Sequence, residues 1–143
     1  MPNETIERNK AAVDRYADEI WNKGNFAIFE EFVTPDCVVH HPMPGSKPGV
    51  EGLKAAILAY RTAFPDTKMT ILHMVAEGEY VVDHWRMTGT HTGPMMGMPP
   101  TGRQVDYEGM KLQRMRDGKI AEFWSLPDAL TMLQQLGLAP MPG

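Results

Sequence analysis

The stretch GTHTGPMMGMPPTGR, residues 89–103, separates two runs of this chain that have the pattern of β-strands, residues 80–88 and 104–115. Its glycines and prolines argue against a regular helix or strand, and its methionines make it too apolar for a linker exposed to water. Methionine side chains adapt readily to irregular apolar surfaces. We therefore expect this loop to cover either a hydrophobic pocket or a partner subunit.

Around the loop, apolar residues recur with a period of two, which is typical of β-strands. The pattern predicts strands over residues 67–76, 80–91, 104–115 and 119–125. Short turn-rich segments separate them, and the Asp117-Gly118 pair is a strong hairpin signal. Residues 37–41 are a further, brief strand candidate.

Before these strands the apolar spacing is helical. Residues 6–20 predict a first helix that Gly24 ends, and Asn25 is placed to cap a short second helix that carries Phe26, Phe29 and Phe32. A third helix over residues 53–64 follows, and a last helix over residues 130–136 closes the chain. Helices first and hairpin-connected strands later predict an α+β fold rather than a doubly wound parallel sheet.

Composition limits the class of protein. The 143 residues suit one domain, residues 1–143. A net charge of −4 without clustered Lys or Arg argues against nucleic-acid binding, and no apolar run approaches the ~20 residues that cross a membrane. The N-terminal residues are polar, and the lone Cys37 cannot form an internal disulfide, so we expect a cytoplasmic protein.

Four segments carry a family resemblance: GTHTG, GMPPTG, RDGKI and PDALTMLQQLG. Together they resemble the SnoaL-like polyketide (ester) cyclases of the nuclear transport factor 2-like superfamily. The resemblance implies a cone-shaped, curved antiparallel sheet wrapped around the N-terminal helices, with an interior pocket and a homodimeric assembly. It also implies ring closure by intramolecular aldol condensation of a small apolar or aromatic substrate, with neither metal nor organic cofactor.

At the positions of the chemistry this chain departs from the family. The resemblance places the acid/base aspartate of the family at Ser125 and a polar residue, often histidine, at Lys111. A serine cannot act as a general base at neutral pH without an activating partner. Ser125 could instead cap the last helix or contact a substrate, and Asp128 could serve the helix N-terminus or take a catalytic role.

Asp83 is a candidate for a displaced base. Alternation along the strand puts it on the more apolar face, with Trp85 and Met87, which should look into the cone. A carboxylate there would be partly desolvated, which suits acid/base work. Two alternatives remain open: Asp83 forms a structural ion pair with Lys111, or the face assignment is wrong.

The remaining polar candidates are weaker. His40 and His41 are adjacent in a strand, so only one of them can face the cavity, and the resemblance favours His40. The other three histidines share no spacing with one another or with carboxylates, so we expect no metal site. Arg114 and Glu122, on adjacent predicted strands, are expected to form an ion pair on the outer face.

The sequence thus favours a cofactor-free cyclase-type enzyme with Asp83 as base and Lys111 or His40 beside the enolate oxygen. A set of largely apolar side chains would pack the substrate: Trp85, Met87, Met95, Met96 and Phe123, with contacts from His41 and Ser125. The alternatives are a non-catalytic binder of a small apolar ligand and a hydrolase that uses a carboxylate-activated water.

Overall fold

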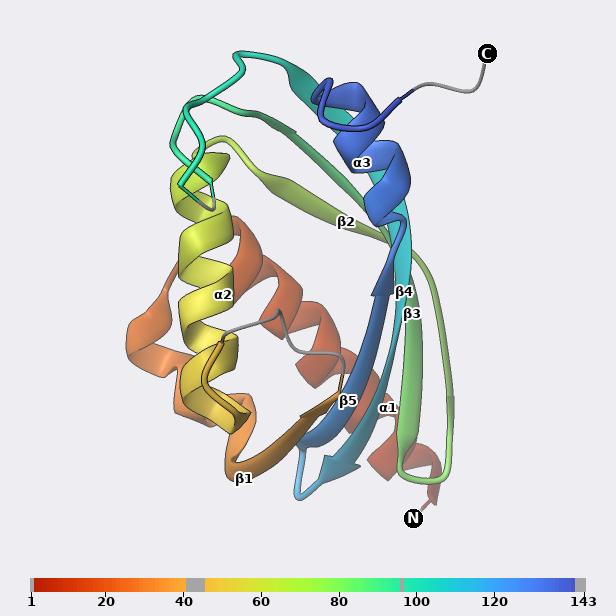
Figure 1. The fold of residues 1–143 in the computed structure, drawn as a ribbon. Coiled ribbons are helices and arrows are strands. Elements are labelled where there is room, and N and C mark those ends of the chain that lie inside the picture. Colours follow the sequence, from red (N-terminus) through yellow and green to blue (C-terminus); the bar gives the residue numbers. More distant parts are fainter. Residues whose placement is uncertain (1, 41–45, 96, 141–143) are drawn as a thin grey trace.

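The computed structural model describes residues 2–40, 46–95 and 97–140, and it confirms the predicted α+β fold (Figure 1). The helical elements are α1 (Pro2–Tyr16), the π-helix η1 (Ala17–Asn22), the 3₁₀-helix η2 (Phe26–Glu31), α2 (Gly49–Ala63) and α3 (Ala129–Gln135). The strands are β1 (Val33–His40), β2 (Lys68–Glu77), β3 (Tyr80–Thr90), β4 (Gln104–Arg116) and β5 (Lys119–Pro127). None of the described helices is long and apolar enough to span a membrane.

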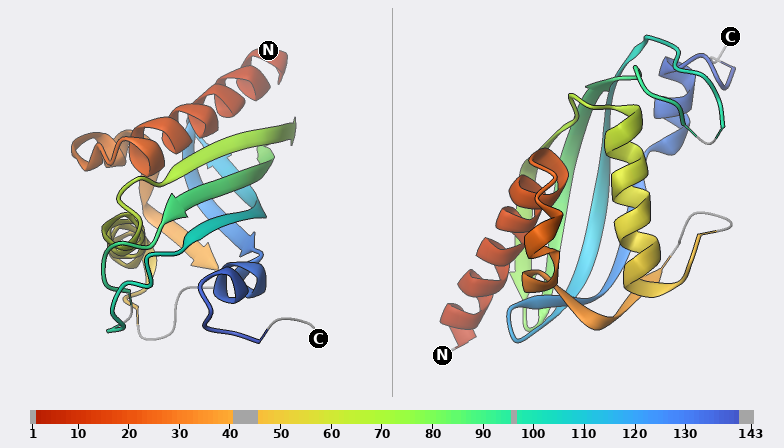
Figure 2. Two further views of the ribbon diagram at one scale, coloured as in Figure 1. Left: turned by 90° about the horizontal axis from the view of Figure 1, so that it is seen from above. Right: turned by 90° about the vertical axis from the view of Figure 1, so that its left-hand side faces the viewer.

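The five strands form one curved sheet in the order β1-β5-β4-β3-β2, and α1 and α2 cover its concave side (Figure 2). Strands β2 to β5 pair antiparallel as consecutive neighbours. Asp117 and Gly118 both have positive φ, as a tight hairpin requires. The edge strand β1 differs from the prediction because it pairs parallel with β5. The chain leaves β1 through α2, crosses to the far edge and returns as a meander, so β5 arrives beside β1 in the same direction.

Strand β1 also begins earlier than predicted, at Val33 rather than at residue 37. Pro35 is tolerated inside it because β1 is an edge strand and its register shifts between Val33 and Val38. Asn25 stands at the N-cap position of η2, but its side chain makes no cap bond and instead donates to Glu19 Oε2 at 3.3 Å.

The first helical run ends just before Gly24, which has a positive φ as a helix stop requires, but its last turn widens into η1. A π-turn inserts an extra residue and changes the direction of the side chains that follow. Asn22 uses its side-chain amide like a strand partner: its Nδ2 donates to Met69 O at 3.0 Å, and its Oδ1 accepts from Met69 N at 2.6 Å. The amide thereby satisfies backbone groups on the edge strand β2.

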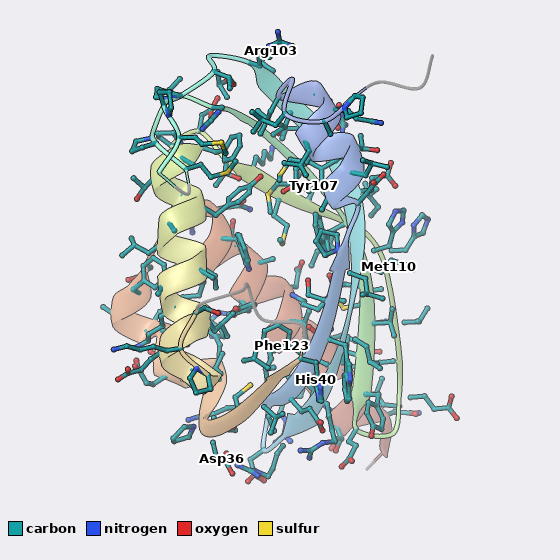
Figure 3. All side chains as sticks on the ribbon, viewed as in Figure 1. Asp36, His40, Arg103, Tyr107, Met110 and Phe123 are labelled. Carbon is teal, nitrogen blue, oxygen red and sulfur yellow. The ribbon has the colours of Figure 1, made fainter. Side chains whose placement is uncertain are left out.

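Two apolar clusters fill the space between helices and sheet. The first lies where α1, η2 and α2 meet β1, β3 and β5, and it contains Tyr16, Phe29, Phe32 and Phe123. The second lies toward the end of α2 and includes Phe64, Trp85, Met87, Tyr107 and Leu136. Figure 3 shows Phe123 and Tyr107 on the helix side of the sheet and Met110 on the opposite, outer side.

The packing around Gly109 gives a test of this register. A Cβ at residue 109 would lie 2.3 Å from Trp85 Cζ2 and 2.8 Å from Pro127 Cα. Gly109→Ala should therefore lower the free energy of unfolding by about 1–3 kcal/mol, measured by urea denaturation. Trp85→Phe removes the ring atoms that clash, so the double variant should lose less stability than the sum of the two single variants. Simple additivity would mean that the indole does not fill the space left by the missing side chain.

Candidate active site

Three polar residues form a row across the concave face of the sheet. Asp83 on β3 is the register partner of Lys111 on β4, and Lys111 is the partner of Ser125 on β5. The predicted face of β3 is confirmed, because Val81, Asp83, Trp85 and Met87 are all buried while the residues between them are more exposed. Register partners on neighbouring strands point to the same face of a sheet, so all three side chains point toward the helices.

Asp83 and Lys111 form the predicted alternative, a buried ion pair. Lys111 Nζ lies 3.7 Å from Asp83 Oδ2, and the side chains are 8% and 0% exposed respectively. At this separation the charges attract without a direct hydrogen bond. The ammonium group also lies over the face of the Tyr16 ring, 5.1 Å from its centroid, where the ring's negative face attracts it.

Gln113, two residues after Lys111, completes the cluster. Its Nε2 donates to Asp83 Oδ2 at 3.0 Å and to Val81 O at 2.7 Å. Two acceptors nearby, Asp83 Oδ1 and Gln113 Oε1, are buried without a hydrogen-bond partner among the described residues. Unpaired buried acceptors are costly, so this polar cluster is suited to receive a donor from a ligand or water.

Tyr16 closes the cluster from α1. Burial raises the pKa of its hydroxyl, the nearby Cys37 and Asp83 raise it further, and a side-chain hydrogen bond with Trp21 opposes them. The hydroxyl therefore remains a neutral phenol at physiological pH. Burial likewise raises the pKa of Cys37 to about 11, so this thiol is an inert part of the core.

The predicted substrate-packing residues divide between the two clusters. Phe123 packs in the first cluster with Tyr16, while Trp85 and Met87 belong to the second, and Met95 packs on the outside of that second cluster. Met96 and His41 lie outside the described residues, so the roles predicted for them stay predictions.

The loop over residues 89–103 is fastened to the end of α2 and to itself. Thr92 N and Gly93 N both donate to Ala63 O, at 3.1 and 3.0 Å. His91 is fully buried against Phe64, and its Nδ1 accepts from Thr101 N at 3.1 Å. These bonds fix the shape of the loop base, which gives His91 a structural role. No group of three potential metal-ligating side chains converges among the described residues.

Two predicted catalytic residues are placed elsewhere. His40 Nε2 lies 2.7 Å from Glu122 Oε2, and the His40 ring stacks on Trp124. Trp124 follows the inward-facing Phe123 in β5 and so points to the outer face. His40 therefore lies on the outer face, where it and Arg114 lower the pKa of Glu122 through hydrogen bonds. Arg114 Nε donates to Glu122 Oε1 at 3.0 Å, in the expected ion pair. The sheet separates His40 from Asp83, so the structure does not bring the two residues together as the sequence predicted.

Asp128 is the second of these residues. It caps α3, a role that the sequence had offered to Ser125. Asp128 stands at the N-cap of α3, where Oδ1 accepts from Thr131 N at 3.1 Å and Oδ2 from Thr131 Oγ1 at 2.6 Å. Both oxygens are occupied at the exposed end of the sheet, which agrees with the predicted alternative that Asp128 serves the helix N-terminus. Ser125 remains within β5, opposite Lys111, because the strand continues to Pro127.

Residues 11–136 match the family model for SnoaL-like polyketide cyclases. The chain belongs to this family. A relative named aklanonic acid methyl ester cyclase DauD, from Streptomyces sp. (strain C5), is 32% identical over 111 residues, which cover 77% of this chain and 67% of the relative.

Solved structures agree with the SnoaL-like assignment. The structure of TsrD from Streptomyces laurentii has a TM-score of 0.83 at 25% identity. The alignment covers 93% of this chain and 97% of the TsrD chain. IdmH from Streptomyces antibioticus, described as a putative polyketide cyclase, has a TM-score of 0.78 at 32% identity, with 90% and 98% covered. The nuclear transport factor 2-like cone is therefore the architecture of this SnoaL-like chain.

Sequence reasoning missed Gln113 and Tyr16 as parts of the polar cluster around Asp83 and Lys111. Alternation on β4 was the available signal for Gln113, because it shares a face with Lys111. Tyr16 fits the apolar stripe of α1, and its position over Lys111 depends on how that helix crosses the sheet.

Two surface hollows lie away from Asp83. One of about 460 Å³ is lined by Val75, Glu77, Tyr80 and Val82 at the β2–β3 hairpin. Another of about 540 Å³ lies beside Asp66, Thr90 and Gln135. Neither of these two hollows is lined by Asp83 or Lys111.

The cap assignment gives a test by thermal unfolding. Hydrogen bonds from Thr131 lower the pKa of Asp128, so its contribution to stability is present above the ordinary carboxyl pKa of 3.8 and disappears as the pH falls through the lower folded value. Asp128→Ala should therefore lower the Tm at pH 7 more than Ser125→Ala does. The difference from wild type should shrink below about pH 4. A larger effect of Ser125→Ala at pH 7 would return the capping role to Ser125.

Proposed function

We propose that this SnoaL-like chain is a small, cofactor-free ring-closing enzyme that acts by acid/base chemistry on an activated carbonyl compound. The observation that supports the proposal is the buried Asp83–Lys111 pair on the concave face, at 3.7 Å. Buried, oppositely charged groups of this kind are common in sites that move protons, although structural ion pairs share the feature. The likeness to a relative named aklanonic acid methyl ester cyclase, and to the polyketide cyclase family, indicates the substrate class.

In this mechanism Asp83 removes a proton from a carbon that lies between carbonyl groups. The C–H electrons become an enolate, and the Lys111 ammonium group stabilises the negative oxygen where charge develops. The enolate carbon then attacks a second carbonyl of the same molecule and forms the ring bond. Protonated Asp83 returns its proton to the new alkoxide, which leaves the enzyme unchanged. The conjugated substrate spreads the charge, so no metal or organic cofactor is needed.

Apolar side chains would hold the flat substrate beside the pair. Phe123 lies next to Tyr16 in the first cluster, and Trp85 and Met87 lie beyond Asp83 on the same face of β3. Met95 packs against the second cluster and would complete the apolar lining toward the loop. Burial of these rings and thioethers would exclude water, which strengthens the electrostatic interactions during the reaction.

The complete burial of Asp83 favours a second candidate, a binder of a small apolar ligand without turnover. In that case the ion pair would contribute polar recognition inside an apolar site. The two functions differ in one respect that can be measured, because only the enzyme loses an activity when the carboxylate is removed.

The first test is Asp83→Asn with aklanonic acid methyl ester as the trial substrate. The amide keeps the shape but cannot accept the proton, so kcat should fall about 100-fold or more while folding is retained by circular dichroism. Loss of one partner can leave Lys111 as an unpaired buried charge, at a cost of about 3–5 kcal/mol. The double variant Asp83→Asn/Lys111→Met removes that charge and should be equally inactive.

Ser125 provides the matched control. Ser125→Ala should keep most of the activity, and Ser125→Asp should raise ring closure if the missing carboxylate is what limits the rate. Full activity of Asp83→Asn would exclude the base role, whereas ligand binding by wild type without any turnover would favour the binder.

We also propose that the chain is a homodimer that pairs through the outer face of the sheet. An apolar patch on this face consists of Val75, Val82, Met110, Leu112, Trp124 and Leu126. Met110 and Leu126 are register partners and are 52% and 63% exposed. Apolar patches of this kind on a soluble chain are typical of interaction surfaces, and a second copy offers a matching patch by two-fold symmetry.

The dimer is tested with Leu126→Lys and a matched control, Leu58→Lys. Leu58 is 56% exposed but lies on α2, in the helical layer and not on the sheet. Sedimentation at micromolar concentration should give twice the monomer mass of 16.0 kDa for wild type and for the Leu58 variant, and the monomer mass for the Leu126 variant. A monomeric wild type would contradict this proposal.

A further inference from the structure

The two oxygens of the Asp83 carboxylate have different surroundings. Oδ2 receives the Gln113 Nε2–H at 3.0 Å and faces Lys111 Nζ at 3.7 Å. Oδ1 is buried and has no hydrogen-bond partner among the described residues. A carboxylate with one oxygen held by donors and one left open has a defined direction in which it can accept a proton.

Gln113 is itself held in place. It is 0% exposed, and its Nε2 also donates to Val81 O, the backbone carbonyl of its register partner, at 2.7 Å. The opposite orientation of the amide would point Oε1 at two acceptors, Val81 O and Asp83 Oδ2. The chemistry of its neighbours therefore determines which end of the amide faces Asp83.

We infer that Gln113 is a positioning residue that locks the Asp83 carboxylate through Oδ2 and leaves Oδ1 as the oxygen that takes and returns the proton. The inference rests on the proposed function for the step that Oδ1 performs. The lock itself is a property of the folded protein and can be measured without turnover.

The lock has a consequence for the ion pair. Lys111 Nζ stays beyond hydrogen-bond distance of Oδ2, while Gln113 occupies the short contact to that oxygen. Without the amide, the carboxylate is free to rotate, so that either of its oxygens can face the ammonium group. A base in such a pair would present either oxygen, and its lone pairs would no longer point in one direction.

The experiment uses Gln113→Met, which has similar length and no donor. Gln135→Met is the matched control, because Gln135 also makes two side-chain bonds, to Asp106 N at 2.7 Å and to Asp106 O at 2.8 Å, but belongs to α3 rather than to the polar cluster. The two readouts are the steady-state kinetics of ring closure and the ¹³C NMR titration of the Asp83 side-chain carboxyl, assigned with Asp83→Asn.

Loss of the donor destabilises the ionised carboxylate. In Gln113→Met the midpoint of the Asp83 titration should therefore rise by about half to one pH unit. Gln113→Glu places a second carboxylate beside the first and should raise the midpoint further. In Gln113→Met, kcat should fall at least about tenfold with KM within about twofold. Gln135→Met should change neither kcat nor the titration, although it loses two hydrogen bonds.

The outcomes separate the two proposals. An unchanged titration in both Gln113 variants overturns the lock, whatever the activity. An active wild type with an inactive Asp83→Asn and a fully active Gln113→Met also overturns it, while the base role of Asp83 stands. Shifted titrations in the order Met then Glu support the lock even if wild type closes no ring, in which case the cyclase proposal alone fails.

Discussion

The site depends on one constraint, the burial of Asp83 and Lys111 together under the helices. Removing two charges from water costs several kcal/mol per ion unless attraction and hydrogen bonds offset it. Gln113 supplies the hydrogen bond and the Tyr16 ring faces the ammonium group, so β3, β4 and α1 must keep their relative positions. A shift of β4 by one residue would turn Lys111 outward and leave Asp83 alone in the core. The same pair thus enforces the register and forms the polar centre of the candidate site.

The parts of the molecule that follow from local pattern were predictable from sequence. Period-two alternation placed Asp83, Trp85 and Met87 inward, and the Asp117-Gly118 turn joined β4 to β5. The ion pair of Asp83 with Lys111 remained one of two open alternatives, the other being that the face assignment is wrong. A long loop joins β3 to β4, so no tight turn defines which of their residues lie opposite each other. The structure settles this pairing because the whole ladder from Tyr80 to Thr90 is continuous.

Features that depend on long-range contacts escaped prediction. His40 faces outward because β1 pairs parallel with β5, and no local signal in an edge strand containing Pro35 defines that register. The spacing of Ser125 and Asp128 fits a capping box, yet α3 starts one turn later than that motif requires, so Asp128 caps it. The π-turn of η1 likewise has no signature in a sequence whose apolar spacing fits one continuous helix.

The order of the strands bears on how a displaced base could work. Lys111 lies between Asp83 and Ser125, with one strand spacing on each side, so residues 83 and 125 are roughly 10 Å apart. The resemblance places the acid/base of other family members on the Ser125 side. If Asp83 is the base, Lys111 is still its neighbour, but the base lies on the β3 side of Lys111 instead of the β5 side. The reacting carbon must then lie over β3. The substrate would then be rotated about Lys111, with its ring system toward Trp85 and Met87 on the face that β3 presents.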